Sequence, residues 1–265
     1  MATRLTRRQR QRAVRGFFYG LFGLALVGLL YVADWERLQR EFFNREIAGV
    51  MFPEVITIAA KNTVLYTFLA FTIGLLFGLI LALMRLSPIA PYRWVARTYI
   101  EIFRALPALL TIFLFALGIP IAFNWRPPGG FAGAGVIGLI VVAGAYMAET
   151  IRAGIEAVPK GQIEAARSLG MSPTWAMLSI VLPQAFRIVI PPLTNELVLL
   201  IKDTSLLALI GATVTSRELL GFSQARLVEF SNSTPLIVAG AIYAAITIPL
   251  TQLVAVLERR NRRSR

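Results

Sequence analysis

The 265-residue chain contains no cysteine and no histidine. Without cysteine it has no disulfide framework and no thiolate metal site, and without histidine it has no imidazole ligand. Ser-His and Cys-His nucleophile pairs are excluded for the same reason. We therefore predict no catalytic residues and no metal site, and we interpret the protein as a non-enzyme. A membrane-embedded enzyme would have to rely on carboxylate or Ser/Lys chemistry.

Charged residues are also scarce, at 15% of the chain, whereas 57% of the residues are hydrophobic. This balance is far from that of a soluble globular domain and predicts an all-α polytopic membrane protein in contact with the lipid bilayer. The net charge of +13 does not indicate a nucleic-acid partner, because the basic residues lie between and beside apolar runs. Their placement indicates membrane topology instead.

The sequence has no Gly-x-x-x-x-Gly-Lys-Ser/Thr phosphate-binding loop. Such a loop cradles nucleotide phosphates with its backbone N–H groups. We therefore predict no cofactor in this chain.

The apolar runs predict about six transmembrane spans. Their approximate limits are 17–33, 57–84, 99–118, 136–153, 193–212 and 235–257. The first run is near the lower length limit for a span, and a cleaved signal peptide is the alternative. No small-x-small cleavage site follows it, so a retained helix is favoured.

Three regions follow from this pattern. Residues 1–56 comprise a basic tail, an extra first helix and an interfacial segment of mixed charge; residues 57–258 form the transmembrane domain, and residues 259–265 form a basic tail. Pro107 is expected to break the third span, and Pro191 and Pro192 are expected to break the helix before the fifth. Residues 119–135 and 213–234 are predicted to be external loops.

The basic residues predict the orientation of the spans. Segments on one side, 1–15, 85–97, 152–187 and 259–265, hold 18 of the 27 basic residues, and those on the other side hold six. By the positive-inside rule, both termini are predicted to be cytoplasmic in a multi-pass protein of the bacterial cytoplasmic (inner) membrane.

Spacing within the spans predicts two contacts. Gly74 and Gly78 are four residues apart, the small-xxx-small spacing that lets two membrane helices approach closely. Glu101 and Arg104 are three apart and are expected to pair on one helix face.

Residues 156–183 form a polar island between apolar spans, and local signals predict two short helices within it. Gly170 is suited to the left-handed position that ends the first helix. Ser172 is suited to cap the second, with Pro173 at its first position, where the missing N–H is not needed. The segment is therefore predicted to be a helix-turn-helix knuckle.

This island resembles the cytoplasmic coupling loop of the membrane subunits of ABC importers. In such loops, Glu-Ala-Ala is followed by a spaced glycine and a Leu-Pro pair. The residues that carry the match, and that the resemblance assigns to coupling, are Glu164, Ala165, Ala166, Gly170, Ile180, Leu182 and Pro183.

Further runs over about residues 50–260 resemble the polar amino-acid branch of these permeases. They are Tyr146-x-Ala148-Glu149-x-x-Arg152-x-Gly154-Ile155, Pro159-Lys160-Gly161-Gln162, Leu182-Pro183-Gln184-Ala185, Pro191-Pro192, Asn195-Glu196 and Lys202-Asp203-Thr204-Ser205-Leu206. Two features depart from the branch: the extra first span, and Ala105-Leu106 before Pro107, where the branch usually has Gly-Thr.

The resemblance implies a permease that imports polar amino acids, with coupling helices between its fourth and fifth spans. It implies a cytoplasmic ATPase dimer, a second permease subunit, identical or paralogous, and an extracytoplasmic solute-binding protein. The alternatives are a permease of the same class for another small polar solute and an ion-coupled secondary carrier.

The candidate substrate site lies in the fifth span. Glu196 and Asp203 are seven residues apart and project from nearly the same helix face. Ionisable groups within a span tend to face a cavity or a partner. Two carboxylates suit an ammonium group or a cationic side chain, and Asn195, Thr204 and Ser205 are candidates to supply hydrogen bonds. Alternatively, the carboxylates pair with Lys61, Arg104 or Lys202 and hold the bundle together.

Overall fold

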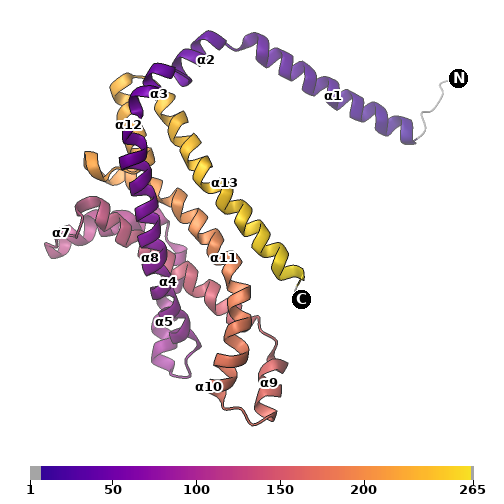
Figure 1. Ribbon diagram of the computed structural model, residues 1–265, viewed down its shortest axis with the longest axis vertical. Helices are drawn as coiled ribbons and strands as arrows, with labels where there is room; N and C mark the ends of the chain where they lie inside the picture. The colour runs from indigo at the N-terminus through magenta and orange to yellow at the C-terminus, as the bar shows by residue number, and fades with distance from the viewer. Residues whose placement is uncertain (1–6, 264–265) are drawn as a thin grey trace.

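The computed structural model describes residues 7–263, which form helices and turns without any strand. The helices make an elongated bundle (Figure 1). In chain order the elements are α1 (Arg7–Val32), α2 (Trp35–Phe42), α3 (Arg45–Met51), η1 (Val55–Ala60), α4 (Lys61–Leu86), α5 (Ala90–Ala105), α6 (Ala108–Phe113), η2 (Leu114–Gly118), α7 (Ile119–Phe123), α8 (Gly130–Glu156), α9 (Lys160–Ser168), α10 (Pro173–Ala176), η3 (Met177–Val181), α11 (Leu182–Asp203), η4 (Thr204–Ile210), η5 (Val214–Ser216), α12 (Leu219–Phe230) and α13 (Thr234–Arg263).

The described residues contain five helical segments long and apolar enough to cross a membrane. A sixth candidate is the pair formed by α5 and the helix from Ala108 to Phe123, which is bent by 108°. The bend lies at Leu106 and Pro107, because proline cannot donate the backbone hydrogen bond that would continue the helix. The all-α fold with about six spans is confirmed, as is the break at Pro107.

The centre of the bundle is the crossing of α4 and α8. A Cβ atom on Gly78 would lie 2.9 Å from the carbonyl oxygen of Gly144, and one on Gly74 would lie 3.1 Å from Cβ of Ala143. Both glycines are therefore needed for the close approach, as their spacing predicts. Around the crossing, Ile112, Leu139 and other side chains from α6, α8, α11 and η4 form the largest buried cluster.

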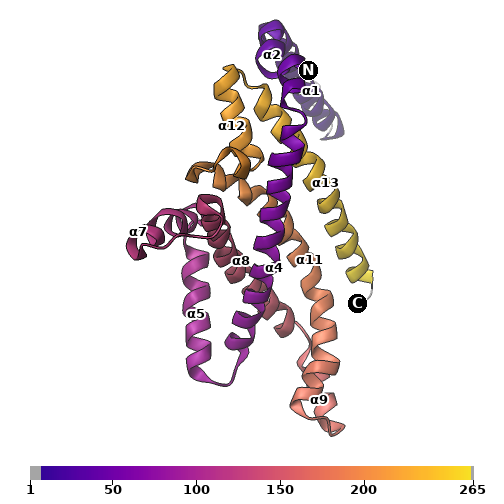
Figure 2. The same ribbon diagram turned by 60° about the vertical axis from the view of Figure 1, so that its left-hand side comes forward.

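The first helix stands apart from this bundle. Figures 1 and 2 show α1 leaving α2 and running away from the other helices, and none of its apolar stretch is buried against the rest of the chain.

The interfacial segment that follows is anchored to the bundle by two hydrogen bonds. Asn232 donates to the carbonyl oxygen of Arg40 at 2.9 Å, and Ser233 N–H donates to the carbonyl oxygen of Glu41 at 2.9 Å. The domain limits at residues 56 and 258 stay predictions.

The expected break at Pro191 and Pro192 is wrong. α11 runs without interruption from Leu182 to Asp203, with both prolines inside it. The fifth span therefore begins well before residue 193. Each proline removes one N–H donor, but a membrane helix packed by neighbours tolerates this loss, and α11 contacts α8 on one side and α13 on another.

The expected loop at 213–234 contains a helix of 12 residues, α12. Its N-cap is Glu218, whose two carboxylate oxygens accept from Leu220 N–H at 2.7 Å and from Gly221 N–H at 2.6 Å. Tyr243 on α13 donates to the same carboxylate at 2.9 Å. Burial raises the pKa of Glu218, and these three hydrogen bonds oppose the rise. Glutamate is not among the residues preferred at N-caps, so the sequence gives no strong local signal for this helix.

Candidate functional site

The polar island 156–183 folds as the predicted knuckle at one end of the bundle (Figure 1). α9 ends before Gly170, which has a φ of +83°, a conformation that favours glycine. Ser172 Oγ accepts from Trp175 N–H at 3.2 Å and caps α10, with Pro173 at its first position. The guanidinium of Arg167 donates a hydrogen bond to the carbonyl oxygen of Met171 at 2.7 Å, which stabilises the turn. The local signals in the sequence are confirmed.

The predicted coupling residues differ in their exposure. Glu164, Ala165 and Gly170 are exposed on the knuckle, whereas Ala166 is only 4% exposed. Since α9 packs against η3, the small side chain of Ala166 is packed in the interior of the knuckle. The other three residues lie in the following helical segment: Ile180 and Leu182 are half-buried in η3 and at the start of α11, and Pro183 is exposed.

Two apolar side chains at the tip of the knuckle were not among the predicted coupling residues. Leu169 is 84% exposed and Trp175 is 64% exposed. They flank the turn at Gly170 and project from an otherwise polar segment. Isolated exposed apolar residues are common in proteins, but a leucine at the end of α9 and a tryptophan on α10 expose apolar surface on both sides of the same short connection. Their positions close to Gly170 are the feature of the sequence from which Leu169 and Trp175 could have been predicted.

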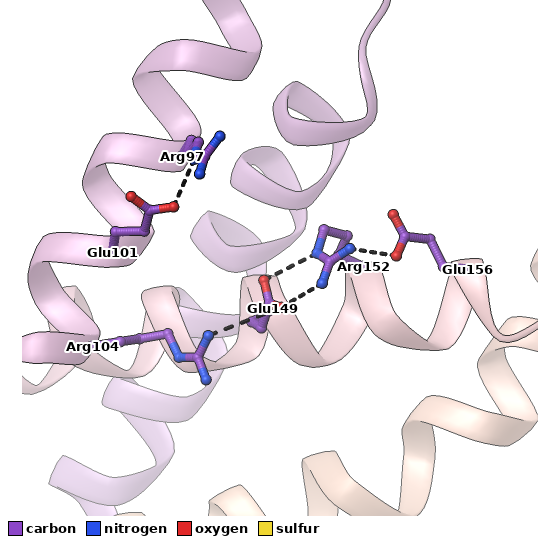
Figure 3. A network of polar contacts seen from close by, with 6 residues as sticks. All are labelled: Arg97, Glu101, Arg104, Glu149, Arg152 and Glu156. Atoms are coloured by element: carbon purple, nitrogen blue, oxygen red, sulfur yellow. Dashed lines mark hydrogen bonds and ion pairs between the residues drawn. The ribbon is translucent and has the colours of Figure 1, made fainter.

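A charged network joins α5 to the end of α8 (Figure 3). Arg152 pairs with Glu149 at 2.5 Å and with Glu156, all on α8. Arg104 reaches across from α5, and its Nη1 lies 4.0 Å from the Glu149 carboxylate. Its guanidinium also lies 5.6 Å from the ring centroid of Tyr146, at cation–π distance.

The expected pair between Glu101 and Arg104 is wrong. Glu101 instead accepts from Arg97, one turn earlier on α5, at 2.7 Å (Figure 3). Arg104 is left to contact α8, because it lies in the last turn of α5, directly before the bend. This network connects the bend at Pro107 to the last two turns of α8, and Glu156 ends the helix that leads into the knuckle.

Glu196 and Asp203 are both half-buried on α11. Within residues 7–263, neither carboxylate has a hydrogen bond or an ion pair within 4.0 Å. Arg104 and Asp203 both lie within electrostatic range of Glu196, and Lys202 within that of Asp203. Direct pairing with Lys61, Arg104 or Lys202 is therefore absent from the described part of the chain. The two carboxylates lie together on one helix, near an arginine from α5.

The three predicted hydrogen-bonding residues of the substrate site have different surroundings. Thr204 is fully buried, and its hydroxyl donates to the carbonyl oxygen of Ile201 at 2.6 Å. Ser205 is half-buried in η4, and Asn195 is exposed on α11. Their role at a substrate stays a prediction, as does that of the carboxylates. Arg104 on α5 lies within electrostatic range of Glu196 without forming a direct ion pair with it.

Comparison with known proteins gives a consistent result. A family model described as "Binding-protein-dependent transport system inner membrane component" matches residues 74–263. The chain is 38% identical to the probable glutamine ABC transporter permease protein GlnM of Bacillus subtilis (strain 168), over 77% of this chain and 91% of the relative. It is 35% identical to the arginine transport system permease protein ArtQ of the same organism, over 71% of this chain and 84% of the relative.

A solved structure agrees with these relatives. The crystal structure of an amino acid ABC transporter with histidines contains a chain that is 37% identical to this one. The two superpose with a TM-score of 0.73, over 81% of this chain and 97% of the other.

Proposed function

Since the chain belongs to the family of binding-protein-dependent transport system inner membrane components, and is thus the permease subunit of an ABC importer, we propose that it translocates a polar amino acid. The observation that carries this proposal is the pair of half-buried, unpartnered carboxylates on α11, Glu196 and Asp203, with Arg104 nearby. The glutamine and arginine permeases among its relatives support the same class of cargo.

The chemistry of the three side chains suits a zwitterion. A carboxylate in a partly buried site attracts an ammonium group, and a guanidinium binds a carboxylate through a planar pair of donors. Glu196 and Asp203 would hold the α-ammonium group, or a cationic side chain, and Arg104 would hold the α-carboxylate. Arg104 is only 4.0 Å from Glu149, so a bound carboxylate would compete with Glu149 for it. That competition would link cargo binding to the charged network that leads to the knuckle.

The partners follow from the knuckle and from the family. The exposed surface of Leu169 and Trp175, together with Glu164, Ala165 and Gly170, would dock into a cytoplasmic ATPase dimer. ATP and Mg²⁺ would act on that partner and not on this chain. A second permease subunit and an extracytoplasmic solute-binding protein would complete the importer in the bacterial cytoplasmic membrane, with both termini of this chain in the cytoplasm.

The orientation can be tested with single cysteines, because the chain has none of its own. Thr174 is exposed on the knuckle, and Val228 is exposed on α12 at the other end of the bundle (Figure 1). In intact cells, an impermeant thiol reagent should label Val228→Cys and spare Thr174→Cys. Permeabilised cells should label both. The reverse pattern in intact cells would invert the topology and place the knuckle outside.

The substrate site is tested by Glu196→Gln and Asp203→Asn, which remove the charge and keep the shape nearly constant. A hydrogen bond to a charged group contributes about 1.5–3 kcal/mol, or about one to two decades in affinity. Each change should therefore raise the cargo concentration needed for half-maximal uptake by about tenfold or more. Uptake and cargo-stimulated ATP hydrolysis in proteoliposomes are the measurements, and Glu46→Gln, at an exposed position of α3, is the matched control.

Unchanged uptake by both variants, at normal abundance and assembly, would remove these carboxylates from the cargo site. The alternatives give different results in the same vesicles. Another small polar solute would stimulate ATP hydrolysis where amino acids do not. An ion-coupled secondary carrier would transport under an ion gradient without nucleotide.

A further inference from the structure

A cavity of about 500 Å³ opens between the end of α4 and the start of α5. This cavity is next to the turn between α4 and α5, which lies at the same end of the bundle as the knuckle (Figures 1 and 2). We call it the Arg85 pocket, and its lining residues are Arg85, Arg93, Trp94, Arg97, Thr98 and Glu101. Neither the candidate cargo site nor the knuckle uses any of them.

The three arginines of the Arg85 pocket are not equally neutralised. Arg97 pairs with Glu101 at 2.7 Å (Figure 3). Arg93 donates to the carbonyl oxygens of Ser87 and Pro88 at 3.0 and 2.6 Å, contacts that orient its guanidinium without cancelling its charge. Two of the three positive charges therefore face no acid in the pocket.

Among the three arginines, Arg85 gives the strongest indication that the pocket binds an anion. Its Nη1 atom is buried and has no hydrogen-bond partner, and the described chain gives Arg85 no ion pair. Glu149 lies within electrostatic range but is already paired with Arg152 and approached by Arg104. A buried donor without a partner is costly, and the cost is higher for a charged group. Arg85, which is half-buried and lines the pocket, therefore brings to it a positive charge that no acid of the described chain pairs with.

The surroundings of the Arg85 pocket are those of a membrane interface. Trp94, which lines it, is 76% exposed, and Tyr92, Val95 and Ile89 also expose apolar surface on or beside α5. Tryptophan and tyrosine concentrate at the level of lipid headgroups. Basic pockets between membrane helices bind anionic headgroups, and arginine recognises phosphate through a bidentate pair of donors.

We propose that the Arg85 pocket binds the phosphate of an anionic phospholipid, with Arg85 and Arg93 as donors and Trp94 packed against the glycerol and the start of the acyl chains. Free phosphate offers the same acceptor oxygens. It has no apolar part to contact Trp94 and Val95, which is why the lipid fits the site better. This assignment is independent of the cargo and of the ATPase.

The test uses the full-length permease, stripped of lipid in detergent and titrated with phosphatidylglycerol or phosphatidylcholine. Bound lipid is counted by native mass spectrometry. The wild-type chain should bind phosphatidylglycerol about tenfold or more tightly than phosphatidylcholine, and Arg85→Gln should lose that preference. Arg85→Lys, which keeps the charge but not the fork of donors, should retain part of it. Arg126→Gln, on an exposed external turn, is the matched control and should bind as the wild type does.

Three results would overturn the proposal. The first is an unchanged preference for phosphatidylglycerol in Arg85→Gln. The second is full displacement of the lipid by millimolar inorganic phosphate, which would make free phosphate the ligand. The third is loss of ATPase association in Arg85→Gln with lipid binding intact, which would assign the pocket to a protein partner. Since none of the lipid measurements uses transport, a failure here is distinct from a failure of the proposed cargo site.

Discussion

Replacing Leu169 by glutamate is expected to abolish ATP-driven uptake while the permease remains folded and inserted. Leu169 is 84% exposed at the tip of the knuckle and has no packing role in the chain, so the change costs the isolated permease little. In the assembled importer it would place a charge in an apolar contact, and an unpaired charge buried at an interface costs several kcal/mol. Uptake in proteoliposomes and copurification of the ATPase should both fall by at least about tenfold.

Leu169→Met is the matched control, since it keeps an apolar side chain of similar volume and should retain uptake. The melting temperature of the Leu169→Glu permease without its partner should equal that of the wild type. Normal uptake by Leu169→Glu with the ATPase still bound would show that the tip of the knuckle does not carry the coupling contact. The docking surface would then lie on another part of the permease.

Replacing Gly78 by valine is expected to prevent normal folding of the bundle. A Cβ atom at this position would lie 2.9 Å from the carbonyl oxygen of Gly144 and 3.0 Å from the backbone nitrogen of Ala148. Both atoms belong to the backbone of α8, so α4 and α8 must move apart to admit the side chain. Overpacking of this kind costs about 1–3 kcal/mol or more. The abundance of the folded permease in membranes and its melting temperature in detergent are the measurements.

Gly28 on α1 provides the matched control, because no atom lies within 4 Å of the position its Cβ would take. Gly28→Val puts the same side chain into an apolar helix without a steric conflict and should leave abundance and melting temperature unchanged. Equal stability of Gly78→Val and Gly28→Val would mean that α4 and α8 do not cross as closely as described. The core of the bundle would then need a different arrangement.

The sequence by itself determined the features that depend on neighbouring residues or on composition. The apolar runs indicated the spans, and Gly170, Ser172 and Pro173 indicated the knuckle, because helix ends are set by the few residues around them. Gly74 and Gly78 indicated a close helix contact, although not the identity of the partner helix. The spaced pattern from Glu164 to Pro183 was enough to suggest the family.

Only the tertiary structure decided which distant side chains meet. Arg104 contacts Glu149 on another helix instead of Glu101 on its own helix. Ala166, which the resemblance assigns to coupling, packs inside the knuckle. The helix continues through Pro191 because neighbouring helices pack around it, and α12 forms where Tyr243 on another helix supports its cap. Each of these outcomes depends on the free energy of contacts between residues far apart in the chain. Local propensities contain no term for such contacts, so they cannot predict them.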